Sequence, residues 1–141
     1  SILDSLGWLR FKQGKLRDSR DASGNVTEPG AISLLTRALE ARDGNDNAVI
    51  TEHLADALWA AGETQKAKDN WELARVTARR AVDQILAVRS QRNLGEEDDS
   101  FKVELAELRG VLAQTELKLK ALAEGKEPTI PNHAPVVTTS R

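Results

Sequence analysis

The chain has 141 residues, of which 40% are apolar and 30% charged, and its formal net charge is -2. This composition excludes a disordered chain, and no apolar run approaches the roughly 20 residues that a membrane-spanning helix needs. The absence of Cys excludes disulfides and thiolate metal sites, and the slight excess of acidic residues argues against nucleic acid as the main partner. The cellular compartment stays open.

Five helices are predicted, since Ala, Leu, Glu, Arg and Lys dominate between the glycines, and we expect nearly no sheet. The first three helices cover residues 2–13, 31–41 and 48–61, because apolar side chains recur there at helical spacing. Residues 15–30 are rich in Asp, Ser, Gly and Asn and predict an exposed loop.

Two longer helices follow in the second half of the chain. The fourth begins near Thr64, whose hydroxyl we expect to cap it, and no helix breaker occurs before Gly95. The fifth covers residues 101–123, and apolar or small side chains recur in both helices at alternating steps of three and four. We therefore predict an antiparallel helical hairpin over residues 64–124, followed by an extended, proline-containing tail over residues 125–141. The recurring positions are Trp71, Ala74, Ala78, Ala81, Ile85 and Val88, then Leu105, Leu108, Leu112, Thr115, Leu119 and Leu122.

Residues 2–75 contain an internal repeat. Each unit carries small and large side chains at matching positions, and its first helix is followed by a glycine, Gly14 or Gly62. Small residues let two helices cross closely, and the large residues fill the space between them. The matched positions are Leu6, Gly7 and Phe11 with Leu54, Ala55 and Trp59, and Ala31, Leu35 and Ala38 with Ala67, Trp71 and Ala74.

This pattern resembles the tetratricopeptide repeat (TPR), a helix-turn-helix unit of about 34 residues. The resemblance implies an all-α, TPR-like superhelix with two repeats over residues 1–75 and the long helical hairpin as a cap. The first unit departs from the family pattern, because residues 15–30 enlarge a turn that is normally short and Arg10 stands where an aromatic residue is usual.

The resemblance also implies that the chain is incomplete as a repeat array. Such repeats usually need at least about three copies to bury a continuous core. We therefore expect further repeats upstream in a larger parent protein, of which this chain is a C-terminal fragment. We also expect an exposed apolar end through which the chain associates with itself.

The family resemblance implies a concave groove, lined by the first helix of each unit, that binds a peptide or a partner protein. An acidic pair at Glu52 and Asp56 would repel a carboxylate and suits a peptide with Lys or Arg and an apolar side chain. The alternative is that Trp8, Phe11 and Trp59 are ordinary packing residues between helices. The expected groove residues are Asp4, Ser5, Trp8, Phe11, Lys12, Glu52, His53, Asp56 and Trp59.

No catalytic or metal-binding motif stands out in the sequence. His53 and Asp56 provide two ligands on adjacent helical turns, but a third convergent ligand is not evident. Neither a nucleophile elbow nor a glycine-rich phosphate loop occurs. We therefore expect no enzyme activity, no metal and no cofactor.

Two other functions remain as alternatives. The helical hairpin and the exposed repeat end could serve as an oligomerisation module. The fourth helix could bind nucleic acid through its arginines, although we favour a solvated face that pairs with Glu104, Glu107 or Glu116. The loop 15–30 either takes part in binding or is simply exposed, and the sequence leaves both roles open. We expect the tail to pack on its own repeats or on a neighbouring copy. The arginines are Arg75, Arg79, Arg80, Arg89 and Arg92.

Overall fold

The computed structural model describes residues 2–41, 46–92 and 99–130, and within them the chain is helical apart from one small two-stranded sheet. The prediction of an all-α protein is confirmed. In these described residues, no helix has the length and apolar character needed to cross a bilayer. The elements are α1 (Ile2–Lys12), β1 (Ser19–Arg20), β2 (Val26–Glu28), α2 (Ala31–Glu40), α3 (Asp46–Ala60), α4 (Thr64–Gln91) and α5 (Asp99–Ala123).

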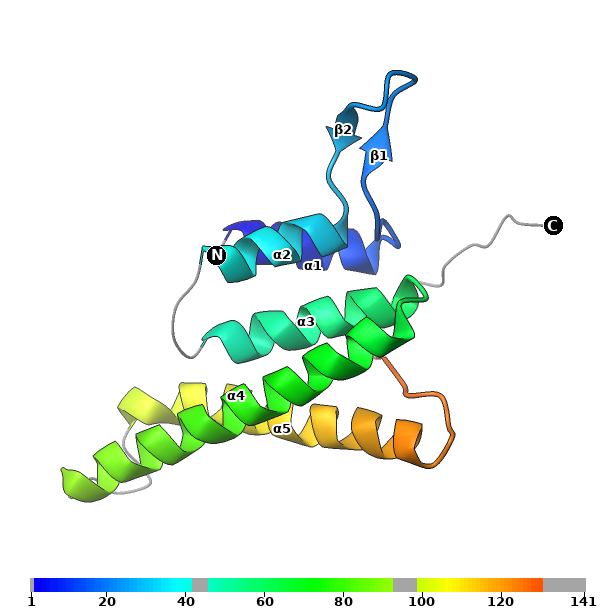
Figure 1. The fold of residues 1–141 in the computed structure, drawn as a ribbon. Coiled ribbons are helices and arrows are strands. Elements are labelled where there is room, and N and C mark those ends of the chain that lie inside the picture. Colours follow the sequence, from blue (N-terminus) through cyan, green and yellow to red (C-terminus); the bar gives the residue numbers. More distant parts are fainter. Residues whose placement is uncertain (1, 42–45, 93–98, 131–141) are drawn as a thin grey trace.

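Helix α3 lies at the centre of the molecule, with α1 and α2 on one side and α4 and α5 on the other (Figure 1). It contacts all four other helices, so side chains around most of its circumference are buried. This burial explains why polar as well as apolar positions of α3 lie inside. Its buried residues are Ala48, Ile50, Thr51, Glu52, Leu54, Ala55, Asp56, Ala57 and Leu58.

The two glycines of the internal repeat end α1 and α3 in the same way. Gly14 and Gly62 have φ angles of 75° and 84°, which favour glycine because a β-carbon is strained there. At each end the glycine N–H donates to a carbonyl three residues back, and the next N–H donates to one five residues back. The prediction that Thr64 caps α4 is wrong, because Glu63 occupies the cap position and Thr64 is the first helical residue.

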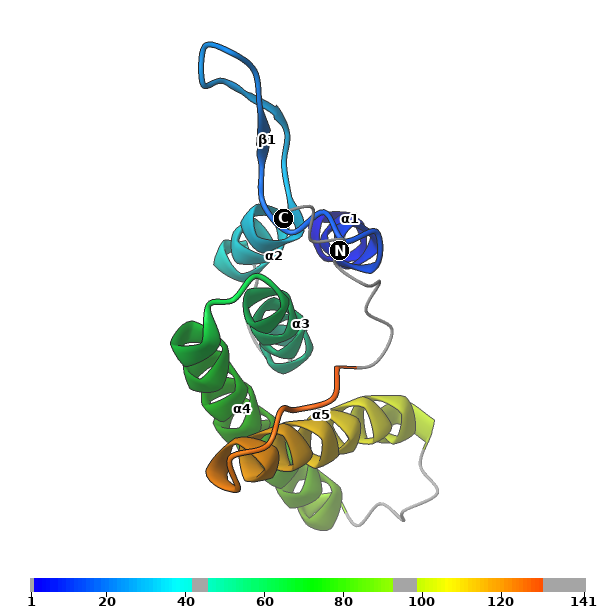
Figure 2. The ribbon, with the colours of Figure 1, turned by 90° about the vertical axis from the view of Figure 1, so that its right-hand side faces the viewer.

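Residues 15–30 form more than the predicted loop, because β1 and β2 pair as a short antiparallel hairpin that projects from the helices (Figure 2). Its base is fixed by backbone hydrogen bonds to the start of α2, and the Asp18 carboxylate accepts the Gly30 N–H at 2.9 Å. This hydrogen bond lowers the pKa of Asp18. Glu28 pairs with Arg10 of α1.

Helices α4 and α5 run in roughly opposite directions and cross (Figure 1). Buried apolar side chains from both helices form a second core cluster together with Ala48 of α3. It contains seven of the twelve predicted positions, with Val82 and Val111 in addition. The predicted Trp71, Leu119 and Leu122 pack in the other core cluster, and Val88 is only partly buried. Arg79 pairs with Glu116 at 3.7 Å, as expected for a solvated face. Arg89 does not belong to that face, since only 8% of it is exposed. The predicted turn before residue 99 lies outside the described residues.

Candidate peptide-binding face

Three predicted groove residues lie on one side of α3. Glu52, His53 and Asp56 are one, three and four positions apart, so one side of the helix carries all three. His53 reaches α1, and the two carboxylates reach α5. We call the surface over these side chains the α1–α3–α5 face. Asp4, Trp8 and His53 are partly exposed on it, and Glu52, Asp56 and Lys118 are buried beneath it.

Lys118 of α5 forms a buried charge cluster with α3. Its Nζ lies 2.8 Å from Asp56 Oδ1 and 3.4 Å from Glu52 Oε2, and only 2% of the side chain is exposed. The Trp71 indole N–H donates to the same Asp56 oxygen at 2.9 Å, and Nζ lies 5.7 Å from the centroid of this indole ring. The cluster therefore connects α3, α4 and α5 through charge-assisted hydrogen bonds and a cation–π contact.

Burial raises the pKa of Glu52, an effect that the Lys118 charge opposes and the Asp56 charge increases. Two carboxylates share one ammonium group in this buried site, so the anionic form of Glu52 is disfavoured. The sequence assigned these carboxylates to a basic peptide side chain, but the structure places Lys118 of the same chain against them. They lie beneath the surface that a peptide would contact.

Sequence reasoning missed Lys118 because lysine is rarely buried. Two features of the sequence, taken together, indicate a buried lysine at this position. Lys118 follows Thr115 by three positions, in the inward-facing row of α5. The acidic pair sits four positions apart among apolar residues of a helix expected to be central, and such a pair requires a buried cation.

An aromatic cluster connects α1 to α3. The Trp8 ring stacks on Phe11 and on His53, with centroid distances of 4.7 Å and 4.0 Å. His53 Nδ1 lies 3.2 Å from Asp4 Oδ1, which fixes the imidazole orientation. Phe11 is buried, whereas Trp8 and His53 are partly exposed. This cluster therefore presents aromatic surface to solvent on the α1–α3–α5 face.

The remaining predicted groove residues lie elsewhere. The Trp59 ring packs against Trp71, with centroids 5.7 Å apart, so it belongs mainly to the core. Lys12 is exposed. Ser5 lies on another side of α1, beside a shallow apolar depression of about 570 Å³. That depression is also lined by Ile2, Leu6 and Leu9.

The described part of the tail lies against the helices. Residues 126–130 leave α5 without helical structure and run back across the side of the molecule on which α1, α3 and α5 lie (Figure 2). Pro128 is buried, Thr129 is exposed, and Ile130 is partly buried against the core cluster to which α1, α2, α3 and α4 contribute. This part of the tail therefore packs on its own chain, whereas residues 131–141, with His133, lie outside the described residues.

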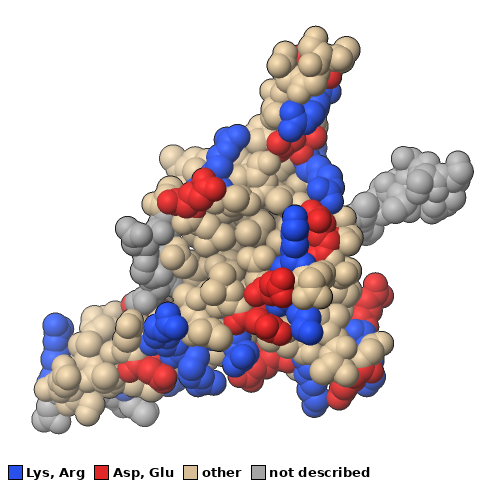
Figure 3. Space-filling model, in the orientation of Figure 1, with Lys and Arg blue, Asp and Glu red and all other residues tan. Residues whose placement is uncertain are grey.

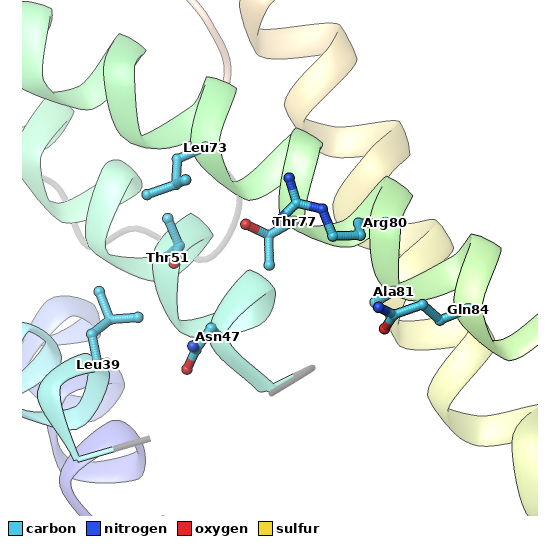
Figure 4. A pocket seen from close by; sticks show the side chains of 8 residues that line it. All are labelled: Leu39, Asn47, Thr51, Leu73, Thr77, Arg80, Ala81 and Gln84. Atoms are coloured by element: carbon cyan, nitrogen blue, oxygen red, sulfur yellow. The ribbon is translucent and has the colours of Figure 1, made fainter. Parts of the chain in front are cut away.

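A second depression, of about 480 Å³, lies on the opposite side, between α2, α3 and α4 (Figure 4). Polar side chains from α3 and α4 line it, with Leu39 and Leu73 at its edge (Figure 4). Figure 3 shows basic and acidic side chains interspersed over the lower helices on the face it presents. On that face the arginines form no uniformly basic stripe of the kind that binds nucleic acid.

Within the part of the chain that the structure describes, no three metal-ligating side chains converge. Comparison of the chain with protein-family models, with curated proteins and with solved structures found no match.

Proposed function

We propose that this chain is a protein–protein interaction module without catalytic activity. The pairs α1–α2 and α3–α4 are two TPR-like repeats, and α5 caps the second. The α1–α3–α5 face holds an extended segment of a partner protein. This proposal combines the repeat pattern of the sequence with the contacts on that face.

The packing at matched positions supports the repeat assignment. Ala31 and Ala67, which lie in the first turn of the second helix of each unit, are both fully buried. A β-carbon at Gly7 would lie 2.9 Å from Leu35 Cγ, and Ala55 at the matched position is fully buried. Small residues are therefore needed at the same helix crossing in both units.

The observation that carries the binding proposal is the course of residues 126–130. This segment lies extended on the face, buries Pro128 and places Ile130 against the core. An extended chain therefore fits there without displacing a helix. Trp8 and His53 add partly exposed aromatic surface, which favours side-chain contacts with a ligand. Because Glu52 and Asp56 are buried and already pair with Lys118, this acidic pair gives no preference for basic peptides.

Capture of partners by the immobilised full chain tests the proposal. Proteins bound from a lysate of the source organism are quantified by mass spectrometry for the wild type, Trp8→Ala and Leu73→Ala. Leu73 is an exposed apolar residue on the far side of α4 and serves as the matched control. We expect Trp8→Ala to lose proteins that the wild type and the control retain. Recovery of the same proteins by all three variants rejects the proposal.

Self-association is a second candidate, favoured by the apolar end of α1. Ile2 is 86% exposed and Leu9 49% exposed, and both line the shallow depression on α1. Burying these side chains between copies removes apolar surface from water, at about 25 cal/mol per Å². Light scattering of the wild type and Leu9→Lys tests this function, because only self-association through α1 makes the mass depend on that substitution.

A further inference from the structure

We infer that residues 126–130 act as a built-in competitor for the partner's segment, and that the partner presents an extended chain with proline followed two residues later by a branched aliphatic side chain. The inference rests on the proposed function and adds the class of ligand and the regulation of the site. Its basis is the way in which the chain itself occupies the α1–α3–α5 face.

The exit of the tail from α5 is fixed by the backbone. Gly125 has a φ of 72°, and its N–H donates to the Leu122 carbonyl at 3.1 Å. The Lys126 N–H donates to the Ala121 carbonyl at 2.8 Å. These two hydrogen bonds end the helix and reverse the chain. The end of α5 therefore directs the tail back across the helices and onto this face.

The side chains of the tail alternate as expected for an extended ligand. Pro128 is buried, Thr129 is exposed and Ile130 packs against the core. In an extended chain, every second side chain points the same way, so the side chains of Pro128 and Ile130 both point towards the face. Proline is also inexpensive to bury in this form, because it lacks an N–H donor and its φ is already restricted. These two positions define the recognition pattern.

The tail leaves part of the face open. A depression of about 450 Å³ lies between α5 and the tail, and Leu117 beside it is 62% exposed. Trp8 and His53 are also partly exposed. A partner with the same pattern and additional contacts to these side chains would displace the tail. An isolated copy of the tail sequence would not, because a short tether gives the attached segment an effective concentration in the millimolar range.

The test uses the full chain and a synthetic peptide with the sequence of residues 124–130, acetylated and amidated. Ile130→Asp places a charge where the tail meets the core and releases the tail. Thr129→Asp adds the same charge at the neighbouring exposed position and is the matched control. Binding of the peptide is followed by two-dimensional NMR of the labelled protein. We expect Ile130→Asp to bind at least about tenfold more tightly than the wild type and Thr129→Asp, since only release of the tail removes the tethered competitor.

Three results would overturn the inference. First, if no variant shows saturable shifts up to about 5 mM peptide, the tail sequence is not a ligand of this face. This concentration is in the range of the effective concentration that a short tether provides. Equal affinities of the wild type and Ile130→Asp mean that the tail does not compete. Shifts confined to α2 and α4 mean that the peptide binds elsewhere. If circular dichroism shows Ile130→Asp to be unfolded, Ile130→Gly replaces it. Partner capture with Trp8→Ala judges the proposed function separately.

Discussion

Replacement of Lys118 by Met removes the only ammonium group that the structure places in the buried cluster with Glu52 and Asp56. Met retains an unbranched apolar chain, so most of the packing around the lysine methylene groups is kept. Asp56 retains its hydrogen bond from Trp71, but both carboxylates lose the ammonium group that the structure places against them. The substitution therefore tests charge pairing and leaves shape nearly unchanged.

The expected loss is large because the site is buried. Removing one partner of a buried ion pair costs about 3–5 kcal/mol, since the remaining charge stays desolvated. For a domain of this size, such a loss lowers the melting temperature by roughly 10–20 °C. Lys120→Met is the matched control, because Lys120 lies on the exposed side of the same helix. We expect it to change stability by less than about 0.5 kcal/mol.

The loss depends on pH in a defined direction. Burial raises the pKa of Glu52 above its ordinary value of 4.5, and Lys118 opposes that rise. In Lys118→Met the opposition is gone, so the folded-state pKa rises further. A carboxyl whose pKa is raised in the folded state destabilises the fold once the pH exceeds its pKa in the unfolded state. This destabilisation grows until the pH passes its pKa in the folded state. The deficit of Lys118→Met is therefore largest near neutral pH and shrinks towards pH 4.5.

Urea unfolding followed by circular dichroism at several pH values measures this deficit. A matched triple variant that also carries Glu52→Gln and Asp56→Asn should recover part of the loss at neutral pH, because no uncompensated charge remains. A Lys118→Met variant within about 0.5 kcal/mol of the wild type at neutral pH would refute the reasoning. So would a deficit that does not change with pH.

Three further substitutions have defined outcomes in urea unfolding. Glu52→Gln should gain stability relative to the wild type as the pH rises above 4.5, because the raised pKa of Glu52 makes ionisation increasingly unfavourable for the wild-type fold; a difference constant with pH contradicts this. Gly30→Ala places a β-carbon 2.4 Å from the Arg17 carbonyl and should cost about 1–3 kcal/mol, so an unchanged midpoint argues against that contact. Gly110→Ala, in α5 with no atom within 4 Å of the added carbon, should stabilise by about 0.5–1 kcal/mol, and a loss would indicate a hidden neighbour.

The helices were predictable from sequence because their apolar side chains recur at steps of three and four, and because glycines mark three of their ends. The burial of polar residues in α3 was not predictable from α3 alone. Thr51, Glu52 and Asp56 lie inside because other helices surround α3, and a periodicity argument assigns one buried side to each helix. Arg89 was misplaced for the same reason, since its position relative to α5 depends on how the two helices cross.

The β1–β2 hairpin was missed for a different physical reason. Strands of two and three residues are too short to show an alternating pattern. Their pairing depends on the base of the hairpin, where Asp18 and Glu28 hold residues far apart in the sequence. The local composition of this segment correctly indicated exposure, because Asp21, Gly24 and Asn25 form the turn at its tip.

The fixed base of this hairpin has a practical consequence for engineering. The N–H groups of Ala31 and Ile32 bond the carbonyls of Lys15 and Leu16 at 2.9 Å and 3.1 Å, so the distance between the ends of the inserted segment is set by the helices. Asp18, Glu28 and Gly30 also belong to this fixed base, so the part that can vary in length and composition is the exposed tip around residues 21–25. A foreign peptide grafted at the tip, around Gly24, would be displayed in a constant orientation while α1 and α2 keep their packing.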